Sequence, residues 1–139
     1  MPTPTLDLIR GVPLFSGLDD ALLQRLAGEF FEKTFSDGEV IATEGEAGRT
    51  FVVIESGEVS VSVQGTIVST LGPGKAFGEL ALIDKSARSA TVKAVGSAHC
   101  YLMPIWSFRP IVEEQPGMAW TLLESLAKLV RDIEARSAS

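Results

Sequence analysis

The sequence predicts a mainly β domain flanked by helices, and three observations lead to that fold class. Between Phe30 and Tyr101, short β-branched or aromatic runs alternate with glycine-bearing turns such as Asp37-Gly38 and Ser56-Gly57. Regular strand-and-turn spacing of this kind indicates an antiparallel sandwich or barrel. Within it, larger apolar residues alternate with smaller or polar ones, as in half-buried strands. Before and after it, apolar residues recur at helical spacing.

Helices are predicted on both sides of the β region. Asp19 has the side chain of an N-cap, and apolar residues follow at helical spacing, so a helix is expected near 19–29. After the barrel we expect a short helix over 105–114, a break at Pro116-Gly117, and a longer helix over about 118–136. The longer helix carries two apolar stripes, which pack on its own barrel, on a second chain or on both. The stripes are Leu122, Leu126, Leu129 and Ile133, and Leu123, Ala127 and Val130.

The bulk properties fit a single domain over the 139 residues, with its core at about 14–135, the barrel at about 30–104 and the C-terminal helices at about 105–136. A net charge of −6 argues against direct nucleic-acid binding, which needs a basic face. One cysteine, Cys100, excludes an internal disulfide and suits a reducing compartment. The sequence shows neither a signal peptide nor the ~18 apolar residues of a membrane span, so we expect a cytoplasmic protein.

The run from Phe77 to Val92 combines features that bind a small anionic ligand. Gly78 lets backbone approach a ligand closely, and a helix start near 79–83 offers unpaired N–H groups to an anion. Arg88 supplies a planar, permanently charged fork that suits phosphate. Glu79 adds an acceptor for a sugar hydroxyl, or it favours the positive end of the short helix. Phosphate and sugar contacts together indicate a nucleotide.

The same run, Phe77-Gly78-Glu79-Leu80-Ala81-Leu82 followed by Arg88-Ser89-Ala90, resembles the phosphate-binding cassette of cyclic-nucleotide-binding domains. That cassette occurs in the catabolite activator protein, protein kinase A regulatory subunits and cyclic-nucleotide-gated channels. The resemblance covers roughly residues 14–135. It implies an eight-stranded antiparallel β jelly roll with an N-terminal helix and C-terminal hinge and lid helices.

The resemblance also implies roles for individual residues. Arg88 would pair with the exocyclic oxygens of a cyclic phosphate, and Glu79 would accept from the ribose 2′-OH. Gly78, Leu80 and Ala81 would act through backbone N–H groups, joined by Ser89 and Ala90. In the family, the residue after the arginine affects base choice; Ser89 decides little, so cAMP is favoured over cGMP only modestly.

Further residues are expected around the base. Val61, Val63, Val68 and Leu71 match the base-lining strands of the family, although barrel core is an equally good interpretation of each. On the last helix, Ile133 and Glu134 fall where the catabolite activator protein caps the base, and Arg131 lies nearby. Trp106 and Trp120 are expected to pack within the helical part, with Trp120 stacking on a base as the alternative.

Catalysis and metal binding find little support in the sequence. It contains no Ser/His/Asp arrangement, no phosphate-binding P-loop and no dinucleotide fingerprint. His99 and Cys100 are adjacent, but neighbouring side chains of a strand point to opposite faces, and the chain has no other histidine. We therefore expect no enzyme, no metal and no cofactor.

The predicted function is a sensor that binds a cyclic nucleotide and moves its C-terminal helices toward an effector domain or partner of unknown identity. No helix-turn-helix follows the last helix, so the chain is expected to be either a regulatory part of a larger effector or a short protein that works through a partner. A homodimer through the last helix is left open. The alternative is a ligand-free jelly-roll interaction or dimerisation module.

Overall fold

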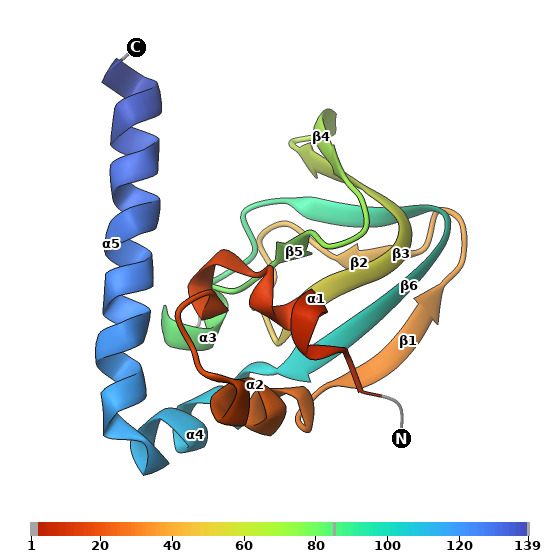
Figure 1. The fold of residues 1–139 in the computed structure, drawn as a ribbon. Helices are drawn as coiled ribbons and strands as arrows, with labels where there is room; N and C mark the ends of the chain where they lie inside the picture. Colours follow the sequence, from red (N-terminus) through yellow and green to blue (C-terminus); the bar gives the residue numbers. More distant parts are fainter. Residues whose placement is uncertain (1–2, 85, 139) are drawn as a thin grey trace.

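The computed structural model describes residues 3–84 and 86–138, and within this part six strands form one antiparallel sheet that curls into a barrel (Figure 1). Strand β6 lies between β1 and β3, β4 pairs with β3, and the short β2 and β5 pair with β6 and β3. The strands are β1 (Phe31–Phe35), β2 (Val40–Ala42), β3 (Thr50–Val63), β4 (Thr66–Leu71), β5 (Ala76–Phe77) and β6 (Thr91–Pro104). The predicted mainly β class is confirmed.

Both β3 and β6 have 14 residues and bend midway. The pairing between them shifts register from Ile54 to Ser56 and again from Ser56 to Glu58. Gly57 lies at this bend with φ +87°, and a Cβ there would overlap the carbonyl oxygen of Ser97. The first half of β3 pairs with the second half of β6, beside β5 and β1. The second half of β3 pairs with the first half of β6, beside β4 and β2. Counting each bent strand as two gives the eight strands of the expected jelly roll.

The helices lie at one side of the barrel. They are α1 (Leu6–Arg10), η1 (Pro13–Phe15), α2 (Asp20–Ala27), α3 (Ala81–Asp84), η2 (Ile105–Ser107), α4 (Phe108–Glu114) and α5 (Pro116–Ala138). Asp19 caps α2 as predicted, because its carboxylate accepts from the Leu22 N–H at 2.9 Å. The helix expected over 105–114 is a 3₁₀ turn followed by α4, and the last helix starts two residues earlier than expected.

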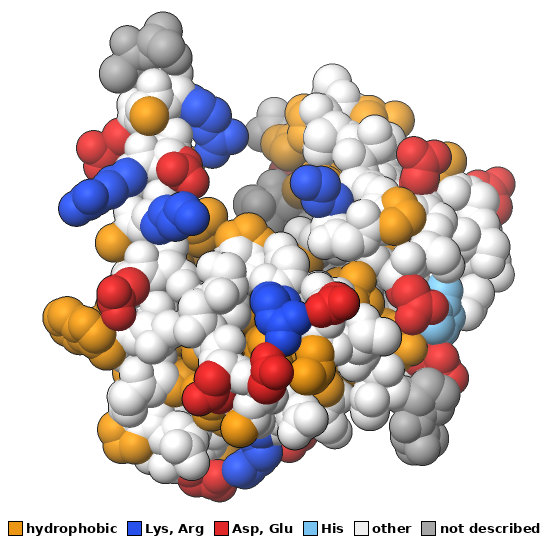
Figure 2. All heavy atoms as spheres, viewed as in Figure 1, with side chains coloured by type: hydrophobic (Ala, Val, Ile, Leu, Met, Phe, Trp, Pro, Cys, Tyr) orange, Lys and Arg blue, Asp and Glu red, His pale blue; other side chains and the backbone are white. Residues whose placement is uncertain are grey.

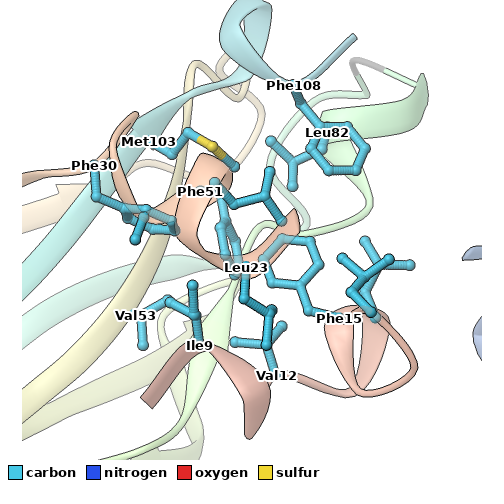
Figure 3. Close-up of a cluster of buried hydrophobic side chains, with 14 of the residues drawn as sticks. Ile9, Val12, Phe15, Leu23, Phe30, Phe51, Val53, Leu82, Met103 and Phe108 are labelled. Carbon is cyan, nitrogen blue, oxygen red and sulfur yellow. The ribbon is translucent and has the colours of Figure 1, made fainter. Parts of the chain in front are cut away.

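The long strands divide their side chains between two cores. Phe51 and Val53 of β3 and Met103 of β6 face the helices, where they pack with Phe15 and Leu23 (Figure 3). Val52 and Ile54 of β3 face the barrel interior, together with Cys100 and Leu102 of β6. This alternation is the period-2 pattern of strands. It fixes the helical layer and the barrel against the same strands.

Helix α5 packs on the rest of the chain only along its first half. Met118, Leu122 and Ser125 are buried, whereas residues 131–137 are exposed. Figure 1 shows the second half of α5 standing clear of the barrel. Leu123 and Val130, from the second predicted stripe, are also exposed. In the described part of the chain, no helix has both the length and the apolar character needed to cross a membrane.

Candidate functional site

A cavity of about 510 Å³ opens between the cassette and the part of the barrel formed by the second half of β3, the first half of β6, β2 and β4. Most of its wall comes from two nearby segments, Ala76 to Ala81 and Ser86 to Ala90. The opposite wall comes from Val61 of β3 and from β4. The lining residues are Ala42, Val61, Ser69, Leu71, Ala76, Phe77, Gly78, Glu79, Leu80, Ala81, Ser86, Ala87, Arg88, Ser89, Ala90 and Val92.

Arg88 is the central charged group of this cavity. Its guanidinium is half-buried, and burial lowers the pKa of this group. Nη2 donates to the backbone carbonyl of Thr50, and the guanidinium carbon lies 5.8 Å from the centre of the Phe77 ring. Among the described residues, no carboxylate forms an ion pair with it. A half-buried cation without an anion is costly, so this group favours an anionic ligand.

Glu79 and the neighbouring backbone provide further unused hydrogen-bonding groups. The half-buried Glu79 carboxylate has no hydrogen bond or ion pair within the described part of the chain. The N–H groups of Gly78, Leu80 and Ser89 likewise have no acceptor among the residues described. One carboxylate acceptor and several N–H donors therefore line a cavity that also holds an arginine. Such a set suits a ligand that has both an anionic group and hydroxyl groups.

Glycine is required where the backbone passes Arg88. Gly78 has φ +85°, and a Cβ there would overlap Nη1 of Arg88. On the other side, a Cβ at Gly48 would lie 3.4 Å from the Arg88 Nε. Gly78 thus adopts a left-handed conformation and leaves room for the guanidinium, which are two separate reasons for glycine.

A short helix, α3, lies within the cassette between Glu79 and Arg88. Helix α3 has only four residues, and Asp84 at its end accepts from the Ser86 N–H at 3.0 Å. Hydrogen bonds from Ser86 are the main cause that lowers the pKa of Asp84. This bond joins the end of α3 to the segment that leads to Arg88. Lys85, between the two, lies outside the described residues.

The structure brings all the predicted cassette residues to the cavity, but only two of the four predicted base-lining residues. Val61 and Leu71 line it. Ser69 lines it as well, since it pairs with Val61 across the strands and precedes Leu71 by two positions on β4. Val68 is on the opposite face of β4 from Ser69 and Leu71 and is 60% exposed. Val63 lies beside the hairpin turn and is also outside the lining. The proposal that these two valines contact a base gains no support from this arrangement.

The predicted lid residues are not at the cavity. Arg131, Ile133 and Glu134 lie in the exposed second half of α5 and do not line it. Of the two tryptophans, Trp106 and Trp120 are both mostly exposed, at 66% and 69%, so the expectation that they pack within the helical part is wrong. Neither lines the cavity. Any capping of a base by α5 requires this helix to move.

The sequence-based prediction missed several lining residues, among them Phe77 and Ser69. Phe77 places its ring beside Arg88, and its position directly before Gly78 was the available signal. Ser69 enters the cavity because β4 presents alternate residues to it. The alternation before Ser69 is weak in the sequence, because the neighbouring Ile67 and Val68 are both apolar. In the structure both of these residues are exposed.

His99 and Cys100 point to opposite faces, as expected. His99 lies between Glu32 and Glu55, with each ring nitrogen 2.9 Å from a carboxylate oxygen, whereas Cys100 is buried in the barrel. Burial raises the pKa of the Cys100 thiol to about 11. Among the described residues, no group of three or more His, Cys, Asp and Glu side chains is placed to hold a metal ion.

The arrangement can be compared with known proteins. A family model described as cyclic nucleotide-binding domain matches residues 32–115. The cAMP-dependent protein kinase regulatory subunit of Yarrowia lipolytica is 36% identical over 99 residues, covering 71% of this chain and 26% of the relative. The cGMP-dependent protein kinase of Eimeria tenella is 44% identical over 82 residues, covering 58% of this chain and 8% of the relative. The chain thus spans about a quarter or less of these two proteins.

A solved structure extends the likeness to nearly the whole fold. The N-terminal domain of a transcriptional regulator from Streptomyces coelicolor A3(2) has a TM-score of 0.84 and 26% identity, and the match covers 94% of this chain and 95% of that one. It supports the jelly-roll class derived above. The family model spans most of the barrel and the whole cassette. The chain belongs to the cyclic nucleotide-binding domain family.

Proposed function

We propose that the cavity binds a purine 3′,5′-cyclic monophosphate, with cAMP preferred over cGMP. The observation that carries this proposal is the half-buried Arg88, which faces the cavity without a carboxylate partner in the described chain. A cyclic phosphate would supply the missing anion, and the free N–H groups of the cassette would bind its other oxygens. The volume of about 510 Å³ is within the usual range of small-molecule sites.

The other groups of the cavity suit the rest of a nucleotide. The Glu79 carboxylate, which has no partner in the described part of the chain, would accept from the ribose 2′-OH. Free phosphate and deoxy analogues cannot make this contact. Val61 and Leu71 form an apolar wall for the base, with Ser69 as a polar group between them. The modest preference for cAMP rests on Glu134, which would accept from the adenine amino group after α5 moves, because Ser89 decides little between the two bases.

The proposed output is a movement of α4 and α5, and the chain is proposed to catalyse nothing. The second half of α5 has few contacts with the barrel, so little packing opposes its movement toward the cavity. Ligand favours the closed arrangement only by its difference in affinity for the two states. We propose that residues 1–139 act as one domain in the cytoplasm, signalling to an effector that the sequence does not identify.

Calorimetric titration tests the binding proposal. Wild-type protein is titrated with cAMP and then cGMP, beside Arg88→Ala and the control Arg109→Ala, which removes an exposed arginine paired with Glu113. We expect one site in wild type and in the control. Loss of the Arg88 pair is expected to cost about 2–5 kcal/mol, or at least roughly thirtyfold in Kd. Equal affinity of Arg88→Ala and wild type would contradict the assignment.

A second candidate, an interaction surface, is favoured by the apolar groove between α3, α4 and α5. The groove has a volume of about 500 Å³ and includes Trp106 and Leu123, both more than half exposed. Figure 2 shows hydrophobic side chains at the outer edge of this helical side. A second copy of the chain packing along α5 would cover it. Sedimentation with and without cAMP tests this; a monomer in both states would remove the homodimer.

A further inference from the structure

The loop between β2 and β3, residues 43–49, contacts both walls of the cavity, and Glu44 joins them. The Glu44 N–H donates to Oγ1 of Thr91 at 3.0 Å, just after the cassette. Oε1 of Glu44 accepts from the Gln64 N–H at 2.9 Å, at the tip of the β3–β4 hairpin. The half-buried Glu44 is therefore bonded to the segment that carries Arg88 and to the hairpin that carries Val61.

The same loop holds the backbone of the cassette arginine. The N–H of Gly45 donates to the carbonyl of Arg88 at 2.9 Å, and the N–H of Arg88 donates to the carbonyl of Glu46 at 2.8 Å. Ala47 forms an isolated bridge with Ala87. These bonds begin at the residue after Glu44. A shift of Glu44 is thereby transmitted to the Arg88 backbone over one residue.

The hairpin tip also needs the bond to Glu44. Gln64 and Gly65 connect the paired Val63 and Thr66, with φ +50° and +83°. A two-residue turn with positive φ at both positions favours Asn, Asp or Gly at the first, and Gln is poorly suited to that conformation. The carboxylate of Glu44 is the group that binds the Gln64 N–H and holds it there. Figure 1 shows that this hairpin projects from the body of the barrel.

We propose that Glu44 is a positioning residue that fixes the base side of the cavity relative to the phosphate side. It does not line the cavity itself, so it acts through Gln64 on the hairpin and through its own main chain on the cassette. This role rests on the proposed binding of a cyclic nucleotide. The net charge of Glu44 is not required for it, because only a hydrogen-bond acceptor at Oε1 is used.

The test compares Glu44→Ala with Glu44→Gln and with a matched control. In the control, Glu39→Ala, the lost bond is of the same kind, since Oε1 of Glu39 accepts from the Ser36 N–H at 3.0 Å in the β1–β2 turn outside the cavity lining. We expect Glu44→Ala to weaken cAMP binding about fivefold, as the loss of one hydrogen bond implies. Glu44→Gln should restore the affinity to within about twofold, because its amide oxygen accepts the same bond. Glu39→Ala should bind like wild type.

A second readout does not depend on nucleotide. In ¹⁵N-resolved NMR spectra, Glu44→Ala should shift the amide signals of both Gln64 and Arg88 and speed hydrogen exchange at Gln64, and Glu39→Ala should do neither. Unchanged signals, or equal affinities of Glu44→Ala and wild type, would overturn the positioning role. If wild type binds no cyclic nucleotide, the proposed function fails by itself, and the NMR spectra still decide whether Glu44 positions Arg88.

Discussion

Substituting Gly78 by alanine should weaken ligand binding through displacement of Arg88. Gly78 has φ +85°, and its added methyl group would overlap Nη1 of Arg88 and lie 3.1 Å from the carbonyl oxygen of Thr50. The left-handed conformation costs about 1–2 kcal/mol for an L-residue with a side chain. Overpacking against the guanidinium and the carbonyl adds roughly 1–3 kcal/mol unless Arg88 moves away. If it moves, the arginine leaves its bond to Thr50 and its place in the cavity.

Gly74 provides the matched control for this substitution. Its φ is +84°, nearly that of Gly78, but nothing lies within 4 Å of an added Cβ. Gly74→Ala should therefore lose only the conformational cost, about 1–2 kcal/mol, and bind cAMP within about twofold of wild type. Gly78→Ala should lose at least tenfold in affinity beyond that control. Urea denaturation gives the stabilities and calorimetry the affinities; equal values for the two variants would refute the close approach of Arg88 to Gly78.

Three other outcomes follow from the packing. Gly57→Ala should destabilise the protein more than Gly74→Ala, because its methyl group meets the backbone of Ser97 and Ala98 at the bend of the long strands; equal urea midpoints would contradict this. Leu23→Ala, in the fully buried core of the helical layer, should cost about 2–5 kcal/mol of unfolding free energy, and a loss below 1 kcal/mol would show that α2 is not packed there. Burial raises the pKa of the Cys100 thiol from 9.0 to about 11, so the folded state keeps a proton that the unfolded state loses. This contribution to the free energy of unfolding is complete below about pH 9 and is lost as the pH rises through 11. At pH 8, a thiol reagent should label Cys100 only as the protein unfolds. Rapid labelling of the folded protein would contradict the burial of Cys100.

The barrel and its helices were predictable because their patterns are local. Glycine-marked turns and period-2 alternation indicated the strands, and Asp19 indicated the start of α2. The cassette was predictable because its lining residues lie within fifteen consecutive positions, from Ala76 to Ala90. The shape of the cassette depends on glycine at position 78, because the backbone there has a positive φ and the Arg88 guanidinium leaves no room for a Cβ.

Features that depend on long-range placement were not predictable. Whether Val68 or Ser69 faces the cavity depends on the register of β4 against β3, which shifts between Val61 and Ser62. Whether Ile133 is packed or exposed depends on where α5 leaves the barrel, and the structure leaves it exposed. The apolar stripe in the sequence would be the same in both cases. The role of Glu44 depends on bonds to residues 20 and 47 positions away, and no short motif encodes these.

The central claim is that a cyclic nucleotide binds at the cavity beside Arg88. The most direct test is a titration of ¹⁵N-labelled wild-type protein with cAMP, followed through the backbone amide signals. Saturable shifts concentrated at Gly78, Leu80, Ala81, Ser89 and Ala90, and absent in Arg88→Ala, are the predicted result. No shifts at millimolar cAMP, or shifts confined to the groove between α4 and α5, would contradict it.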